Sequence, residues 1–191
     1  MSEWRERLTQ TLEPILGSAD PRPALSAYHD LPCAIFVYPP EDEWAVRQEL
    51  GMLKTRLEAR AKRVTVISLA DLMHGALEAE GPLDVLIEAE KTVGVEATAE
   101  TVHGILSDYR PLDSLVLEAI PEDVEPHRDV VFLVRAGALF PFYRTSALLE
   151  LLQGRVTAPT ILFYPGTLDG PVGLRFMGVL EPEHNYRPKI F

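Results

Sequence analysis

The chain has 191 residues, an apolar fraction of 47% and a net charge of −11. This size and composition predict one globular domain over residues 1–191 with a full hydrophobic core, and the negative charge argues against direct binding to DNA phosphates. No apolar run reaches the roughly 18 residues of a membrane span, and no signal-peptide core follows Met1, so we expect a cytoplasmic protein without membrane contact.

The first third of the chain alternates predicted helices and strands. Apolar residues at helical spacing predict a helix over 3–16 that ends at Pro14, followed by a loop over 17–30. A continuous apolar run predicts a strand over 33–37, which Tyr38-Pro39-Pro40 ends. A helix with acidic residues first and basic residues last follows, and it leads to a strand over 64–67.

The middle of the chain is predicted to be helical. Ser68 resembles an N-cap, with Asp71 three residues later, and short helical patterns then continue from 70 to 118 with breaks at Gly81-Pro82 and Pro111. This stretch is too long for one crossover helix. We therefore predict a helical insertion between the second and third strands.

The last third returns to strands. We predict strands over 130–134, 160–164 and about 174–179, with a helix after Arg144 that stops at Gly154. The strands are continuously apolar, which is typical of a parallel sheet covered on both faces. The pattern predicts an α/β fold: a three-layer sandwich with a mostly parallel sheet of about five strands.

Familiar catalytic signatures are absent from the sequence. It contains no phosphate-binding P-loop, no dinucleotide-binding glycine motif, no nucleophile elbow and no zinc-protease helix motif. The five histidines have no metal-ligand spacing, and the acid pairs Glu88/Glu90 and Glu181/Glu183 are interpreted as solvated charge. Cys33 opens an apolar strand and is interpreted as a buried structural thiol. We predict no catalytic residue, metal or cofactor.

Three loops are expected to meet at one edge of the sheet, because the carboxyl ends of parallel strands lie together. They are Tyr38-Pro39-Pro40, the segment 140–146 and Tyr164-Pro165-Gly166. Arg144, Thr145 and Ser146 would lie at a helix N-terminus, a place that favours anions. The alternative is structural: Thr145 or Ser146 caps the helix, and Arg144 pairs with a carboxylate of its own chain.

The second half carries four motifs that resemble one known family. They are an aromatic-proline-phenylalanine block ending in arginine, a phenylalanine-proline-glycine block, a leucine-arginine-glycine strand and an asparagine-tyrosine-arginine tail: Phe140–Arg144, Phe163–Gly166, Leu174–Gly178 and Asn185–Arg187. With these motifs the chain resembles the BrxB proteins of bacteriophage-exclusion (BREX) defence systems. The first half is similar more loosely, at Tyr38-Pro39 and over 66–72.

The resemblance implies a non-catalytic core or adaptor subunit of a phage-defence complex. BrxB proteins are encoded beside a large ATPase, a DNA methyltransferase and PglZ, so the resemblance implies a PglZ-type protein as direct partner and other BREX subunits as further ones. The alternative is an anion- or nucleotide-binding regulator or enzyme with its site around Arg144. An apolar docking patch would suit an adaptor, and Trp4 and Trp44 are candidates for such a patch or for the core.

The candidate ligand- or partner-binding residues combine the predicted edge loops with the motifs of the C-terminal half that carry the family resemblance. For Arg175 and Arg187, as for Arg144, contact with a ligand and pairing with an internal carboxylate are both open. The full set is Tyr38, Tyr143, Arg144, Thr145, Ser146, Tyr164, Arg175, Tyr186 and Arg187.

Overall fold

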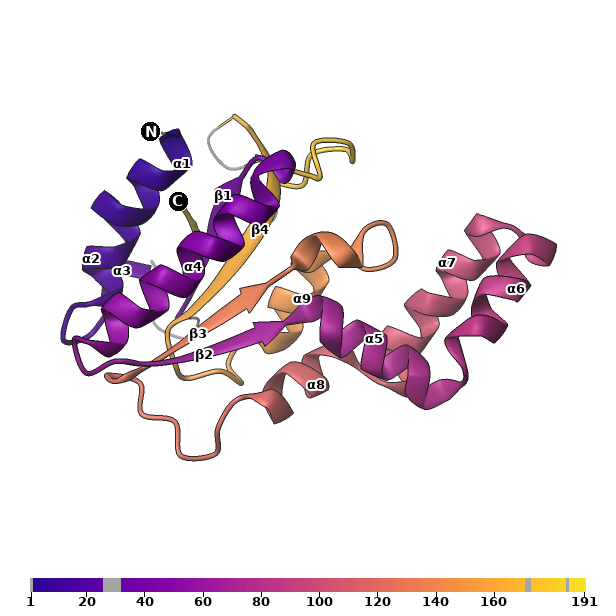
Figure 1. The fold of residues 1–191 in the computed structure, drawn as a ribbon, viewed down its shortest axis with the longest axis horizontal. Coiled ribbons are helices and arrows are strands. Elements are labelled where there is room, and N and C mark those ends of the chain that lie inside the picture. The colour runs from indigo at the N-terminus through magenta and orange to yellow at the C-terminus, as the bar shows by residue number, and fades with distance from the viewer. Residues whose placement is uncertain (1, 26–31, 171–172, 185) are drawn as a thin grey trace.

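The protein folds as three layers, with helices on both faces of one central sheet (Figure 1). The computed structural model describes residues 2–25, 32–170, 173–184 and 186–191. Residues 26–31 of the predicted first loop and Asn185 of the tail motif lie outside the described residues. The three-layer α/β sandwich and its mostly parallel sheet are confirmed.

The sheet has six strands where the sequence predicted about five. The strand order is β2-β3-β4-β1-β6, all neighbours along it are parallel, and β5 pairs with β4 in the antiparallel direction. The added strand is the short β6 of the tail. The strands are β1 (Cys33–Tyr38), β2 (Arg63–Ser68), β3 (Asp129–Val134), β4 (Thr160–Asp169), β5 (Gly173–Phe176) and β6 (Lys189–Ile190).

Strand β4 is longer than predicted, and its extension changes partners. The prediction that it ends at Tyr164-Pro165-Gly166 is wrong, because β5 provides a new antiparallel neighbour that begins where the pairing with β1 stops, at Gly166 opposite Phe176. The Pro165 carbonyl accepts a hydrogen bond from the Met177 amide at 2.9 Å, so this proline interrupts no ladder. Strand β5 ends before the predicted Val179 because Met177 and Gly178 form a turn with positive φ.

One face of the sheet is covered by the N-terminal helices. Pro14 does not end the first helix as predicted: a π-helical segment precedes it, and Pro14 lies in the first turn of the next segment, where its missing N–H is tolerated. The helical segments on this side are α1 (Glu3–Glu6), a π-helical stretch (Arg7–Leu12), α2 (Glu13–Leu16), α3 (Arg22–Leu25), a 3₁₀ turn (Pro40–Asp42) and α4 (Glu43–Glu58).

The opposite face is covered by the helices of the insertion and by α9. The predicted insertion between the second and third strands is confirmed, and the Ser68 hydroxyl caps its first helix by accepting from the Asp71 amide at 3.2 Å. Helices α6 and α7 project away from the sheet (Figure 1). The segments are α5 (Leu69–Glu80), α6 (Leu83–Val93), α7 (Val95–Gly104), a π-helical stretch (Ile105–Tyr109), α8 (Leu112–Ala119), a 3₁₀ turn (Ala136–Leu139) and α9 (Thr145–Leu152).

Two apolar cores result, one on each face of the sheet. On the α4 side, the Phe163 ring lies between Phe36 and Phe132, with ring centroids 5.6 Å and 5.1 Å away. Cys33 is fully buried, and burial raises the pKa of its thiol to about 12, which supports its structural role. The two tryptophans differ: Trp4 is buried in this core, whereas Trp44 is 67% exposed and is not a core residue.

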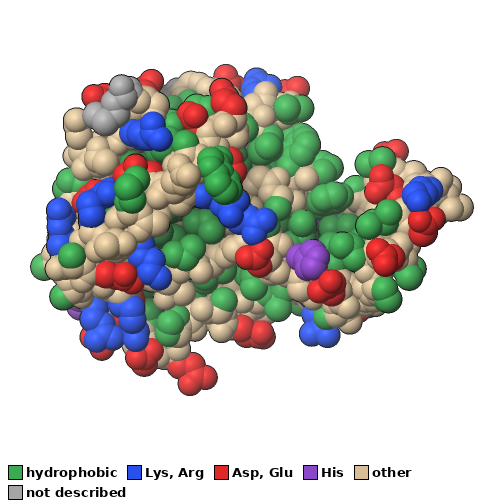
Figure 2. Space-filling model, in the orientation of Figure 1, with side chains coloured by type: hydrophobic (Ala, Val, Ile, Leu, Met, Phe, Trp, Pro, Cys, Tyr) green, Lys and Arg blue, Asp and Glu red, His purple; other side chains and the backbone are tan. Residues whose placement is uncertain are grey.

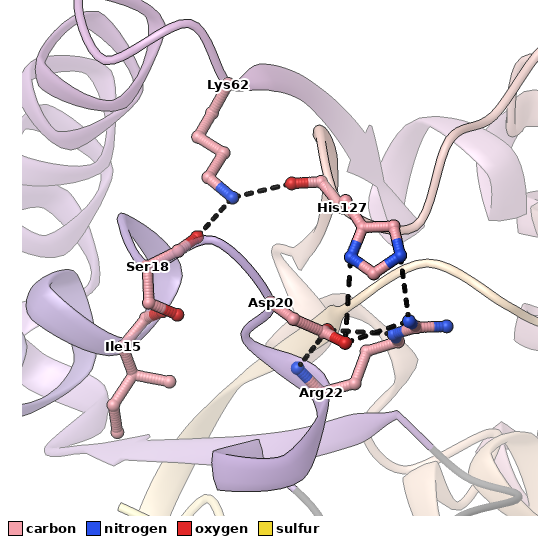
Figure 3. A network of polar contacts seen from close by, with 6 residues as sticks. All are labelled: Ile15, Ser18, Asp20, Arg22, Lys62 and His127. Atoms are coloured by element: carbon pink, nitrogen blue, oxygen red, sulfur yellow. Dashed lines mark hydrogen bonds and ion pairs between the residues drawn. The ribbon is translucent and has the colours of Figure 1, made fainter.

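A polar network joins the N-terminal helices to the loop before β3 (Figure 3). Lys62 is buried, with 8% of its surface exposed. Its ammonium group donates hydrogen bonds to the backbone carbonyls of Ser18 and His127, the latter at 2.7 Å. Burial lowers the pKa of Lys62. Beside it, the Arg22 guanidinium donates to Asp20 at 2.9 Å and lowers the pKa of that carboxyl to about 2. Lys62 therefore ties two loops that are distant in the sequence.

Replacing Lys62 tests how much its two hydrogen bonds contribute to the stability of the fold. Lys62→Met keeps the apolar stem and removes two hydrogen bonds donated by a charged group to the Ser18 and His127 carbonyls, so we expect the free energy of unfolding to fall by about 1–3 kcal/mol in urea titrations. Lys54→Met is the matched control, since Lys54 is partly exposed and makes an exposed ion pair with Glu58; its effect should stay within about 0.5 kcal/mol. Equal losses in both variants would contradict the role of Lys62.

Candidate functional site

The start of helix α9 and the C-terminal tail meet in a chain of polar contacts. The Arg144 guanidinium forms an ion pair with Glu183. The Tyr186 hydroxyl donates to the second oxygen of Glu183 at 3.1 Å and accepts from the Thr145 hydroxyl at 3.1 Å. Burial raises the pKa of Tyr186 to about 12, so its hydroxyl keeps its proton at neutral pH. These contacts hold the tail against α9.

Arg144 does pair with a carboxylate of its own chain, as the structural alternative predicted. The guanidinium is 67% exposed, whereas the Glu183 side chain is 19% exposed. The interpretation of Glu183 as solvated charge is therefore wrong. Residues 39 positions apart carry no sequence signal of pairing, and the contact arises because the tail turns back after β5.

Thr145 and Ser146 do not cap α9. The N-cap residue is Arg144, it has extended backbone, and no side chain of the described residues forms the cap hydrogen bond. Thr145 is buried and uses its hydroxyl on Tyr186 instead. The capping alternative is wrong, because the tail competes for this hydroxyl.

Tyr164 lies beneath this polar chain. Its ring centroid is 6.0 Å from that of Tyr186 and 5.2 Å from that of Phe176, and its side chain is completely buried. Within the described parts of the chain its hydroxyl makes no well-formed hydrogen bond, although the Tyr186 hydroxyl lies close by and already donates to Glu183. Burial, together with the neighbouring Tyr186, raises the pKa of Tyr164 above its usual range. A buried hydroxyl without a well-formed hydrogen bond costs stability.

The other two arginines of the predicted site contact neutral oxygens. Arg187 donates to the Gln153 amide oxygen at 3.3 Å, and Arg175 donates to the Leu180 carbonyl at 3.3 Å. Neither contact is the internal carboxylate that the alternative named. Gln153, on the turn after α9, is a site residue that the sequence did not suggest.

Tyr38 and Tyr143 do not join the polar chain. Tyr38 pairs with Pro165, the residue after Tyr164, so the side chains of Tyr38 and Tyr164 lie on opposite faces of the sheet. The Tyr38 side chain is in the core on the α4 side, where its hydroxyl donates a hydrogen bond to Glu43. Tyr143 is buried in the other core, with its ring centroid 5.7 Å from that of His103. The predicted gathering of all edge residues at one site is thus wrong for these two tyrosines.

Two of the hollows beside the start of α9 are lined by Ser146. The larger, about 410 Å³, lies between α9 and the tail, and the second is about 350 Å³. The larger is lined by Ser146, Leu149, Glu150, Gln153, Tyr186, Arg187 and Pro188; the second is lined by Arg144, Ser146, Pro182, Glu183 and His184. Each therefore presents one arginine and one carboxylate beside a hydroxyl.

The described residues offer neither a metal-binding cluster nor a membrane-spanning helix. No group of three or more histidine, cysteine or acidic side chains there could hold a metal ion. None of the helices in that part of the chain combines the length and the apolar character that a membrane crossing requires.

Comparisons with known proteins point to one family. The family model described as "BREX protein BrxB" matches residues 65–190. A curated protein of Bacillus cereus (strain H3081.97), named BREX protein BrxB, is 29% identical over 189 residues, which cover 98% of this chain and 96% of that protein. No solved structure matches the chain.

Two tyrosine variants test the polar chain. Tyr186→Phe removes the hydroxyl that joins Thr145 to Glu183, so we expect the free energy of unfolding to fall by about 0.5–1.5 kcal/mol. Tyr164→Phe removes a buried hydroxyl that makes no well-formed hydrogen bond, and it should leave the free energy of unfolding unchanged or raise it. Parallel urea titrations compare the two. A loss for Tyr164→Phe as large as that for Tyr186→Phe would contradict the assignment.

Proposed function

Because the chain belongs to the BrxB family of the BREX phage-defence systems, we propose that it is a non-catalytic core or adaptor subunit of such a system, located in the cytoplasm, with a PglZ-type protein as its direct partner. Family membership carries this proposal. The alignment with the curated relative runs over nearly the full length of both chains, so the shared unit is the whole domain.

The arrangement of the candidate site supports the non-catalytic part of the proposal. Arg144, Thr145, Glu183 and Tyr186 contact one another and hold the tail on α9. A general acid, base or nucleophile needs a side chain poised toward a substrate, with a pKa near the working pH. Here the polar groups serve the internal packing of the tail, which favours a rigid subunit surface over a reaction centre.

Co-expression with the PglZ-type protein encoded beside this chain tests the proposal. We expect the two proteins to elute together in size-exclusion chromatography, with a light-scattering mass equal to a stable complex. The physical reason is that a specific subunit contact buries about 1,200–2,000 Å² and survives dilution on the column. Each protein run by itself is the control, and separate elution of the mixed pair would contradict direct binding.

A second candidate function is the binding of a small anion, such as a phosphate or a nucleotide, by a regulator or enzyme. The hollow between α9 and the tail favours it, since Arg187 and Ser146 line one space of about 410 Å³. The pairing of Arg144 with Glu183 weakens it at the position that the sequence suggested, so Arg187 is the better anion contact.

Calorimetric titration with inorganic phosphate and with ATP tests this second candidate. If the hollow binds an anion through Arg187, Arg187→Gln should weaken binding by about tenfold, since a charged hydrogen bond is lost. Arg47→Gln is the matched control, because Arg47 is exposed and stacks on Trp44 outside the hollow. No heat with the wild type, or equal binding by all three proteins, would contradict the anion site.

A further inference from the structure

Helices α6 and α7 form an arm that extends from the body of the protein (Figure 1). No residue of α6 is buried. Leu83 and Leu86 are partly buried against the core, Ala89 is partly buried, and the other residues of the helix are exposed. A helix of this kind gains little from the packing of its own domain, although tertiary packing is the main source of helix stability in proteins.

The arm exposes apolar side chains in a cluster. Of the eleven large apolar residues that are exposed in the described part of the chain, four lie between positions 85 and 95. They are Val85, Ile87, Val93 and Val95, which are 64%, 47%, 57% and 62% exposed. Single exposed apolar residues are ordinary, but a local concentration of them marks an interaction site.

Helix geometry places part of this cluster on one side of the arm. Val85 and Val93 are eight residues apart, which puts them about 80° apart around the axis of α6, and Val95 opens α7 at the same end as Val93. Together with the partly buried leucines, the apolar arc of α6 is wider than the roughly 100° stripe that packing on one neighbour needs. Ile87 lies on the other flank of the leucines, about 160° around the axis from Val85. The side that carries Val85 and Val93 is left exposed.

Acidic side chains border the apolar cluster. Between positions 83 and 104 the chain has five carboxylates and one lysine, and that lysine, Lys91, already pairs with Glu88 at 2.6 Å. Figure 2 shows the acidic and apolar side chains interspersed on the projecting part of the molecule. The carboxylates are Asp84, Glu88, Glu90, Glu96 and Glu100. A complementary surface would be apolar at its centre and basic at its rim.

We propose that the α6–α7 arm is the surface that docks into a partner subunit of the defence system, in an apolar groove rimmed by lysine and arginine side chains. This inference rests on the proposed function, because it assigns the surface through which the subunit binds. Insertion of an amphipathic helical element into such a groove is a recurring mode of recognition. The apolar cluster would form the buried centre of the interface, and the carboxylates would orient the arm in the groove.

The first test removes the apolar centre. The double variant Val85→Asp/Val93→Asp places charges where the partner groove is apolar, so its affinity for the co-expressed PglZ-type protein should fall at least about tenfold, seen as loss of co-elution. The thermal unfolding midpoint should stay close to that of the wild type, since both valines are exposed. Val179→Asp is the matched control: Val179 is 69% exposed on the body of the protein and should leave co-elution intact.

The second test addresses the carboxylates. Glu90→Gln/Glu96→Gln should weaken co-elution and reduce its dependence on sodium chloride, because complementary charges across an interface are screened by salt. A double variant with the affinity and salt dependence of the wild type would show that the basic rim does not exist.

The outcomes separate the inference from the proposed function. If the wild type and the valine variant both co-elute with the PglZ-type protein, the arm is not the interface and the proposed function stands. If the wild type elutes alone, the proposed partner is wrong. The arm is then tested by phage plating on cells that carry the whole defence system.

If the valine variant loses protection against phage while Val179→Asp keeps it, the result supports docking of the arm to another subunit. If the valine variant protects as well as the wild type, the inference is overturned.

Discussion

The double pairing of strand β4 is the constraint on which the rest of the structure depends. Its first half lies between β1 and β3 in a parallel sheet and is buried on both faces, and its second half leaves this sheet to pair with β5. Tyr164 and Pro165 are the last residues paired with β1 before this change of partner. The first half of β4 contributes side chains to both cores, and β5 leads into the tail.

The return of the tail closes the molecule. After β5 the chain passes along α9 and ends as β6 beside β1, where the Phe191 amide donates to the Ile35 carbonyl at 2.8 Å. Glu183 and Tyr186 are fixed on α9 along this path. Parts of the motifs that carry the family resemblance therefore lie together in space: Phe140 and Tyr164 pack on Phe176, and Tyr164 packs on Tyr186.

The buried carboxylates of the protein pair with arginine side chains of the same chain. Asp129 is almost fully buried and is held by Arg63 and the Glu125 amide, while Asp113 pairs with Arg155 and Glu13 with Arg56. An uncompensated buried carboxylate would be costly, so these arginines are committed to the fold. The excess of acid then remains at the surface, and the projecting arm carries a share of it beside exposed valines.

The sequence by itself determined the layers, the helical insertion, the Ser68 cap and the family, because apolar periodicity, capping residues and short motifs are local signals. Only the tertiary structure decided that β4 continues past Gly166, that Tyr38 and Tyr164 lie on opposite faces, that Trp44 is exposed, and that Glu183 pairs with Arg144. Each of these depends on which segments become neighbours, and contacts between residues tens of positions apart are set by strand pairing and packing across the whole domain rather than by any local pattern.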